Sequence, residues 1–172
     1  KLKAYLFNII MKTIEHFVEG KLFSGDSKRT GIIFNPATGE QSAEVKLATI
    51  KDVKDAVLSA KKAFKAWSNK PPLQRARIMF KFKELIEKNS DELTKIIVSE
   101  HGKVYEDARG SLTRGLEVVE YACGIPQMLK GEFTENVGSN VDSWSIRQPL
   151  GVCAGVTPFN FPAMVPMWMF PM

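Results

Sequence analysis

Residues 149–156 (PLGVCAGV) form a nearly continuous apolar run that has the length of a β-strand. Such a run is typical of a strand in a parallel sheet, because helices cover both faces of that sheet. An irregular loop at 157–162 (TPFNFP) follows directly, and an apolar, helix-like tail follows the loop. Strand, loop and helix in this order form the opening βα unit of a doubly wound sheet, in which ligands bind beyond the carboxyl ends of the strands. The sequence therefore predicts an α/β fold with its chemistry in this loop.

Helical patterns fill the region from 49 to 129. Thr49 can cap the first helix, with Asp52 three residues later in a box-like arrangement. Six apolar side chains then recur at three- and four-residue steps and predict one buried stripe: Ile50, Val53, Val57, Ala60, Phe64 and Trp67. Three further helices are predicted, one beginning at Pro71-Pro72 and ending at Lys88, one capped by Ser90 and ended by Gly102, and one from Val104 to about Leu129.

Short strands are predicted before and after these helices. Residues 14–23 contain two strands about Glu19-Gly20, and strands at 32–34 and 43–47 flank a Pro- and Gly-containing turn, so the opening is a small antiparallel arm. After Gly131 the pattern changes to period two, and 141–148 (VDSWSIRQ) is predicted as an exposed strand.

The charge pattern argues against nucleic-acid binding. The net charge of +5 comes from 24 lysines and arginines set among 19 acidic residues, without a block of like charges or a basic stripe interleaved with aromatics. A solvated basic surface is the simpler interpretation. The tail at 159–172 is apolar, but its prolines make it a poor membrane span, so no membrane partner is expected.

The cysteines and histidines do not have the spacing of a metal centre or of a disulfide framework. Cys123 and Cys153 lie far apart, and neither is in a CxxC or Cys/His pattern with His16 or His101. This usage fits a reducing compartment, and we expect a cytoplasmic protein without a metal. Cys153, inside the apolar run, is expected to be a buried structural thiol.

Both ends of the chain look cut. Residues 1–10 (KLKAYLFNII) precede Met11, and their apolar part is too short for a signal peptide and has no cleavage site after it. We therefore expect Met11 to be the natural start, and residues 1–10 to be an extraneous or disordered extension. At the other end the sequence stops inside an apolar run with no helix stop signal, which predicts a truncated domain.

Residues 149–172 (PLGVCAGVTPFNFPAMVPMWMFPM) closely resemble the aldehyde dehydrogenase superfamily. That superfamily has a P-x-G-V strand followed by a Pro-aromatic-Asn-Phe-Pro loop. The stretches FNPATGE, SEHGK at 99–103 and RGLEVVEYACG at 114–124 agree with it. Phenylalanine before the asparagine is similar to the branch that oxidises methylmalonate or malonate semialdehyde.

The resemblance implies the amino-terminal part of the aldehyde dehydrogenase fold: an antiparallel arm, a helical segment and the first βα unit of a Rossmann-type NAD-binding domain. Residues 11–172 would be the start of that NAD-binding domain, and the strand at about 141–148 would belong to an oligomerisation arm. The family is homo-oligomeric, so a dimer or tetramer is expected. No GxGxxG occurs here, and the family does not depend on one.

The activity implied for the full-length parent is NAD-dependent oxidation of methylmalonate or malonate semialdehyde to propionyl-CoA or acetyl-CoA with release of CO2. Coenzyme A would be a co-substrate, and valine and inositol breakdown would be the pathways. The family's nucleophilic cysteine and general-base glutamate lie beyond residue 172, so this chain alone is expected to be inactive. Two alternatives stay open: another semialdehyde dehydrogenase of the succinate-semialdehyde type, and a noncatalytic helical module that assembles through its arm strand.

The resemblance also assigns residues in the loop. Asn160 matches the side-chain amide that donates to the oxyanion formed when a cysteine thiolate attacks the aldehyde. Turn propensity alone is the other explanation for an asparagine here. Four residues match the stretch whose backbone lies along the nicotinamide, against simple loop packing: Val156, Thr157, Pro158 and Phe159.

Three further residues are candidates for contact with the substrate. Phe161 and Trp168 match the aromatic lining of the family's aldehyde tunnel, although a spacing of seven also suits a core stripe. Arg114 stands where relatives that oxidise uncharged aldehydes commonly have an apolar residue, and its guanidinium can hold a substrate carboxylate by two parallel hydrogen bonds. A surface pair with Glu117 is the alternative, and Arg109 is a second candidate for the carboxylate.

Overall fold

The computed structural model describes residues 12–172, and their elements divide between two units, residues 12–60 and 61–172. The division falls within the first helix, α1 (Ile50–Ser68). The predictions made for residues 1–10 and for Met11 lie outside the described residues.

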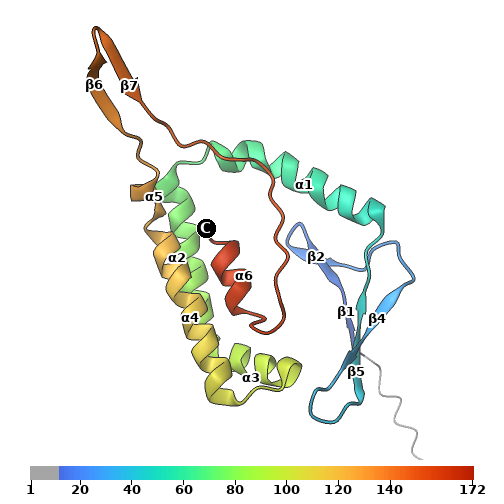
Figure 1. The fold of residues 1–172 in the computed structure, drawn as a ribbon. Coiled ribbons are helices and arrows are strands. Elements are labelled where there is room, and N and C mark those ends of the chain that lie inside the picture. Colours follow the sequence, from blue (N-terminus) through green and yellow to red (C-terminus); the bar gives the residue numbers. More distant parts are fainter. Residues whose placement is uncertain (1–11) are drawn as a thin grey trace, which may run out of the picture. The chain divides into compact units, whose positions relative to one another are not determined.

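Short strands make up most of the first unit (Figure 1). β1 (Lys12–Ile14), β4 (Thr30–Phe34) and β5 (Gln41–Lys46) form a sheet in the order β1-β5-β4, in which β1 runs parallel and β4 antiparallel to β5. β2 (His16–Val18) and β3 (Lys21–Phe23) form a hairpin with Glu19 and Gly20 at positive φ in its two-residue turn. The predicted strands are confirmed, and the parallel pairing of β1 is the departure from a purely antiparallel arm.

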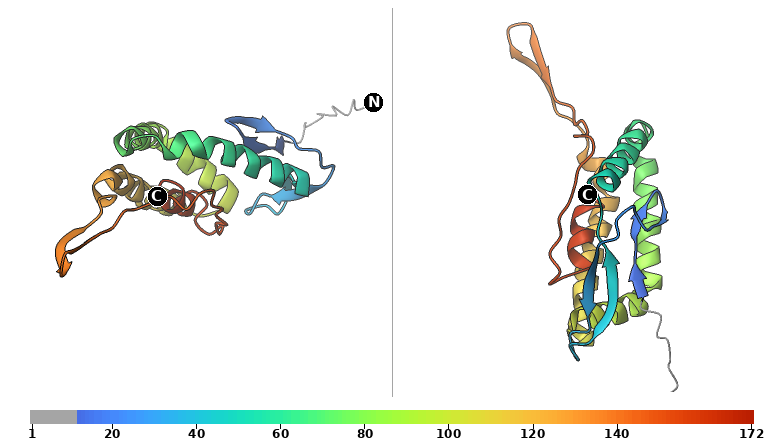
Figure 2. Two further views of the ribbon diagram at one scale, coloured as in Figure 1. Left: turned by 90° about the horizontal axis from the view of Figure 1, so that it is seen from above. Right: turned by 90° about the vertical axis from the view of Figure 1, so that its right-hand side faces the viewer.

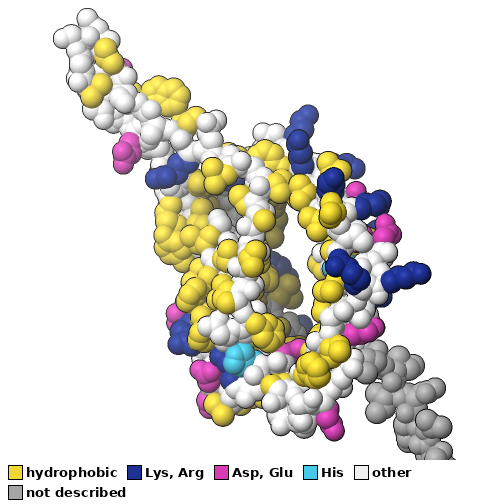
Figure 3. All heavy atoms as spheres, turned by 45° about the vertical axis from the view of Figure 1, so that its right-hand side comes forward, with side chains coloured by type: hydrophobic (Ala, Val, Ile, Leu, Met, Phe, Trp, Pro, Cys, Tyr) yellow, Lys and Arg dark blue, Asp and Glu magenta, His cyan; other side chains and the backbone are white. Residues whose placement is uncertain are grey.

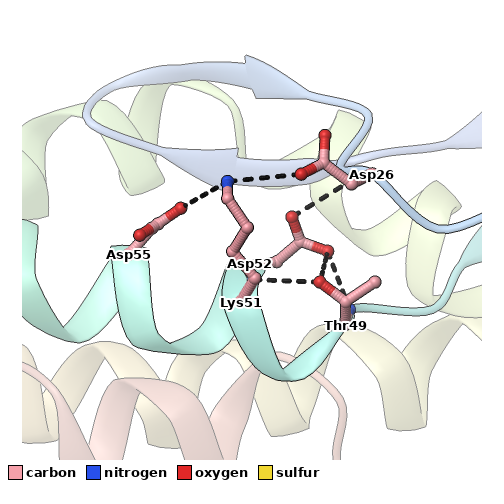
Figure 4. Close-up of polar contacts among 5 residues, drawn as sticks. All are labelled: Asp26, Thr49, Lys51, Asp52 and Asp55. Carbon is pink, nitrogen blue, oxygen red and sulfur yellow. Dashed lines mark hydrogen bonds and ion pairs between the residues drawn. The ribbon is translucent and has the colours of Figure 1, made fainter.

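The first turn of α1 carries the predicted capping arrangement (Figure 4). The Thr49 hydroxyl accepts a hydrogen bond from the Asp52 backbone N–H at 3.1 Å, and the Asp52 carboxylate accepts one from the Thr49 N–H at 2.7 Å. The same carboxylate accepts the Thr49 hydroxyl at 2.7 Å and the Asp26 N–H at 3.3 Å. Asp52 is therefore a buried carboxylate whose hydrogen bonds satisfy the start of the helix and join it to the preceding loop.

The apolar stripe predicted for α1 lies on a helix but is not buried within the described residues. Ile50 is 79% exposed, and Val53, Val57 and Trp67 are also exposed.

Helices dominate the second unit: α2 (Pro72–Lys88), α3 (Ser90–His101), α4 (Tyr105–Cys123), the short α5 (Ile125–Met128) and α6 (Met164–Met169). α2 and α4 pack side by side, and α3 and α6 lie against α4 (Figures 1 and 2). The core between them consists of Ile86, Ile97, Ala108, Leu112, Val119 and Met167. Gly102 ends α3 at a φ of 81°, as predicted.

Two helix predictions differ from the structure. The single helix predicted from Val104 to about Leu129 is divided at Gly124 into α4 and α5, and the start of α3 differs as well. Asn89, not Ser90, is the residue that precedes α3, and its side chain makes no capping bond. The Asn89 amide donates instead to the Leu85 carbonyl at 2.6 Å, and the Ser90 carbonyl accepts the Thr94 hydroxyl at 2.8 Å. The end of α2 therefore competes for the side chain that could have capped α3.

A β-hairpin extends from these helices (Figures 1 and 3). β6 (Phe133–Gly138) pairs antiparallel with β7 (Val141–Trp144), with Phe133 opposite Trp144. The strand predicted at 141–148 is confirmed for its first half, and its partner β6 was not predicted. Every residue of both strands is exposed, including the large side chains of Phe133 and Trp144.

Residues 149–156 do not form the predicted buried strand. The segment runs as an open chain from the hairpin toward α6 (Figure 1), with Leu150 97% and Val156 94% exposed. Cys153, expected to be buried, is exposed. A parallel strand needs a neighbouring strand to take its backbone hydrogen bonds, and the strands of the described residues pair only with one another.

Candidate functional site

The loop after residue 156 is held against α4 by the packing of α6. A side chain at Gly115 would meet the Met164 Cα at 3.1 Å and the Met167 side chain. Met164 and Met167 are buried at this contact. The absence of a side chain at Gly115 thus allows α6 to approach α4 closely and brings the loop before α6 to the same face.

This packing brings the three predicted substrate residues together. The Trp168 indole N–H donates to the Arg114 carbonyl at 3.3 Å. The Arg114 guanidinium carbon lies 5.6 Å from the centre of the Phe161 ring, within the range of a cation–π contact. Arg114 is exposed, and within the described residues it forms no ion pair with Glu117, the partner in the alternative interpretation.

A second cation approaches the same ring. The Lys103 ammonium lies 4.3 Å from the Phe161 ring centre and 2.9 Å from the Asp107 carboxylate, and only 9% of its side chain is exposed. The hydrogen bond from Lys103 holds the pKa of Asp107 below its usual value, and the charge of Arg114 contributes in the same direction. Lys103 and Asp107 were not predicted as site residues, although the SEHGK stretch that contains Lys103 carried part of the family resemblance.

His101, two residues before Lys103, also contacts the loop. Its ring stacks on Phe159 with centroids 6.2 Å apart and an interplanar angle of 24°. The His101 Nδ1 is buried and has no hydrogen-bond partner within the described residues. The end of α3 therefore supports the loop through aromatic contact.

The predicted donor and most of the predicted cofactor contacts are exposed. Asn160 is exposed, and its side-chain amide has no hydrogen-bond partner within residues 12–172. Val156 and Phe159 are 94% and 59% exposed. Pro158 is exposed and Thr157 half-buried. An accessible amide can donate a hydrogen bond to the oxyanion of a bound substrate. The accessible residues next to it can contact a flat ring.

Arg109 is separated from this group. It lies five residues before Arg114 on α4, which rotates it by about 140° around the helix axis. Its side chain lines a cavity of about 210 Å³ between α2, α3 and α4, together with Ser90 and Thr94. The two candidate arginines therefore lie in different surroundings, Arg114 near Phe161 and Arg109 at this cavity.

Other features of the second unit lie away from the loop. A cavity of about 300 Å³ between α2, α4 and α5 contains none of the predicted site residues, and its lining includes Trp67, Ala122 and Met172. Cys123 is buried, which raises the pKa of its thiol and makes it a poor nucleophile. No group of three or more metal-binding side chains occurs among residues 12–172, and no helix there is long and apolar enough to cross a membrane.

Comparison with known proteins identifies the family. The model of the aldehyde dehydrogenase family matches residues 23–172. The malonate-semialdehyde dehydrogenase of Pseudomonas aeruginosa is 51% identical over 162 residues, which are 94% of this chain and 32% of that protein. The mitochondrial acylating methylmalonate-semialdehyde dehydrogenase of Arabidopsis thaliana is 48% identical, over 92% of this chain and 26% of its own length.

Solved structures give the same result. The crystal structure of a methylmalonate-semialdehyde dehydrogenase from Oceanimonas doudoroffii matches with a TM-score of 0.90 and 55% identity, over 94% of this chain and 33% of that one. A structure from Sinorhizobium meliloti 1021, assigned to the same enzyme class and complexed with NAD, matches with a TM-score of 0.90 and 50% identity over the same shares. The chain spans about a third of the length of these relatives. Since the family model covers far more than half of its residues, the chain belongs to the aldehyde dehydrogenase family.

Proposed function

We propose that this chain is the amino-terminal part of an NAD-dependent, coenzyme A-acylating methylmalonate- or malonate-semialdehyde dehydrogenase. The observation that carries the proposal is the grouping of Arg114, Phe161 and Trp168 beside Asn160, although Arg114 and Trp168 are 54 residues apart in sequence. The relatives named for this substrate class, at about 50% identity, support it.

Asn160 is proposed as the oxyanion donor. When a thiolate attacks the aldehyde carbonyl, the carbonyl oxygen becomes an alkoxide, and an amide N–H aimed at it stabilises charge that exists only during the reaction. The side-chain amide of Asn160 is exposed and has no hydrogen-bond partner within residues 12–172, so it is available for this bond. The thiolate and the general base would come from a cysteine and a glutamate outside these 172 residues.

Arg114 is proposed as the carboxylate site. A guanidinium offers two parallel N–H donors to a carboxylate, which fixes the semialdehyde by the end remote from the aldehyde. The Phe161 ring and the Trp168 hydrogen bond hold the Arg114 side chain and backbone in one place. Loss of this carboxylate as CO2 and transfer of the acyl group to coenzyme A would follow oxidation.

NAD would bind along residues 156–159, where it would supply the acceptor for the hydride that leaves the substrate. The exposed Val156 and Phe159 and the open backbone between them fit contact with a planar ring. His101, stacked on Phe159, would keep this stretch in position.

The assembly and location of the parent enzyme are part of the same proposal. The fully exposed β6–β7 hairpin suits pairing with another subunit, so we propose a homodimer or homotetramer that uses this hairpin as an arm. Two free cysteines fit a reducing compartment such as the cytoplasm, with valine or inositol breakdown as the pathway.

The test uses a hybrid enzyme in which residues 12–172 replace the matching third of the Pseudomonas aeruginosa malonate-semialdehyde dehydrogenase. In this hybrid, Arg114→Leu should lower kcat/KM for malonate semialdehyde by a factor that corresponds to about 2–5 kcal/mol, the cost of removing one partner of a charge pair that the bound substrate would bury. Propanal, which has no carboxylate, should be oxidised nearly as before.

Arg109→Leu is the matched control, because it removes an arginine from another face of the same helix. It should leave unchanged the ratio of kcat/KM for malonate semialdehyde to kcat/KM for propanal. An equal loss on both substrates with Arg114→Leu would mean that Arg114 is structural, and a hybrid inactive on every aldehyde would refute the proposed function.

A further inference from the structure

The charges near Phe161 include an acid that could compete with the substrate. Asp107, Lys103 and Arg114 all lie at this site, and the Asp107 carboxylate is paired with Lys103 at 2.9 Å. A carboxylate beside a carboxylate-binding arginine would occupy the donors that the substrate needs. Arg114 can therefore bind a substrate carboxylate only if another interaction keeps the Asp107 carboxylate from pairing with it.

Asp107 and Arg114 are within reach of each other. They lie seven residues apart on α4, about 10.5 Å along the axis and close to the same face. Helical side chains lean toward the amino terminus, so the long Arg114 side chain can extend back toward Asp107. The charge of Arg114 already acts on the Asp107 carboxyl group.

In this structure Asp107 is paired with Lys103 and not with Arg114. The Lys103 side chain is about nine-tenths enclosed, its ammonium lies on the Phe161 ring, and its bond to Asp107 has the length of a charge-assisted hydrogen bond. Arg114, by contrast, is exposed and has no ion-pair partner among the described residues.

We propose that Lys103 is a positioning residue that holds Asp107 away from Arg114 and so keeps the guanidinium available for a substrate carboxylate. The proposal rests on the function proposed above for Arg114. It assigns to Lys103 a role in substrate selection without direct contact with the substrate: when Lys103 is lost, Asp107 turns to Arg114 and becomes an internal competitor.

The test is a double-mutant cycle in the hybrid enzyme. Lys103→Met replaces the lysine by an unbranched side chain of similar length without a charge. It should raise KM for malonate semialdehyde by about fivefold, the effect of one exposed ion pair, with kcat nearly unchanged. Propanal should be unaffected. Adding Asp107→Asn to Lys103→Met removes the competitor and should return KM to within about twofold of the original value.

The double variant separates this role from a structural one, because it also lacks the Lys103 charge on Phe161. If Lys103 only stabilised the fold, KM for malonate semialdehyde would be as high in the double variant as in the single one, and the oxidation of propanal would also be slower. Either result would overturn the proposal. If Lys103→Met does not fold, Asp107→Asn alone decides: KM for the semialdehyde should be unchanged or lower, and a higher KM would contradict the competition.

Failure of this inference is distinguishable from failure of the proposed function. Arg114→Leu, measured first, tests whether Arg114 selects the carboxylate. If Arg114→Leu discriminates between the substrates and the Lys103 cycle does not, only the role of Lys103 is wrong.

Discussion

At the scale of single residues, Asn160 gives the sharpest test of the chemistry. Its amide is exposed, lies in the loop before α6 and has no partner within the described residues. In the hybrid enzyme, Asn160→Ala should lower kcat by about 10²–10³, the usual loss for one oxyanion donor. The KM for NAD should change little. An unchanged kcat, measured where hydride transfer limits the rate, would remove Asn160 from the mechanism.

Sequence could identify these residues only in part. Arg114, Phe161 and Trp168 were predicted from family resemblance, and the structure brings them together through α4 and α6. Lys103 and Asp107 were missed, because a lysine four residues before an aspartate is indistinguishable in sequence from an ordinary surface pair. Only the packing of Phe161 onto Lys103 marks that pair as part of the site.

At the scale of elements, the cap of α1 makes a pH-dependent contribution to stability. Hydrogen bonds from the Thr49 N–H and hydroxyl hold the pKa of Asp52 below its usual value. The stability from these bonds is therefore fully present above the ordinary carboxyl pKa of about 4, and it is lost as pH falls through the lower pKa of the folded state.

The measurement is hydrogen–deuterium exchange of the first turn of α1 in the hybrid. Thr49→Ala should destabilise that turn by about 1 kcal/mol at neutral pH, since the capping hydroxyl is lost. When the pH is lowered, the first turn of α1 should lose less protection from exchange in the Thr49→Ala hybrid than in the unsubstituted hybrid. Thr49→Ser, which keeps the hydroxyl, should exchange like the unsubstituted hybrid. Faster exchange in Thr49→Ser would argue against the cap.

The contact between α4 and α6 provides a second prediction for an element. Gly115→Ala should weaken the docking of α6 by about 1–3 kcal/mol, because the new methyl group meets the Met164 backbone at 3.1 Å. Faster exchange of the α6 amides would report the loss. Gly110→Ala on the same helix meets nothing within 4 Å and should stabilise α4 by about 0.5–1 kcal/mol. Equal effects of the two changes would contradict the packing argument.

The helices were easier to predict than the strands for a physical reason. A helix satisfies its hydrogen bonds within its own segment, so the spacing of apolar residues located α1 to α4, and Gly102 located the end of α3. The break between α4 and α5 at Gly124 was not predicted. A strand depends on its neighbours. The run 149–156 has the composition of a parallel strand but no partner among the described residues, whereas β6, with little apolar pattern, forms because β7 pairs with it.

At the scale of the whole molecule, the 172-residue chain alone should have no dehydrogenase activity. The nucleophile, base and most of the cofactor contacts proposed for the parent lie outside it, and the chain spans about a third of its relatives. The exposed Leu150 and Val156 should also make it poorly soluble. NADH formation from any semialdehyde by the purified chain, or a monodisperse monomer that unfolds cooperatively, would contradict these expectations.

The hydrogen bond between Trp168 and Arg114 has a consequence for the order of folding. The bond closes a loop of 54 residues, whereas α3 and α4 are joined by a connection of three residues, so the entropy lost on pairing them is much smaller. Neighbouring helices can therefore pair early, and α6 docks on a scaffold already formed. Gly115 and the Arg114 carbonyl belong to that scaffold, so the group of residues proposed to select the substrate is among the last parts of the chain to assemble.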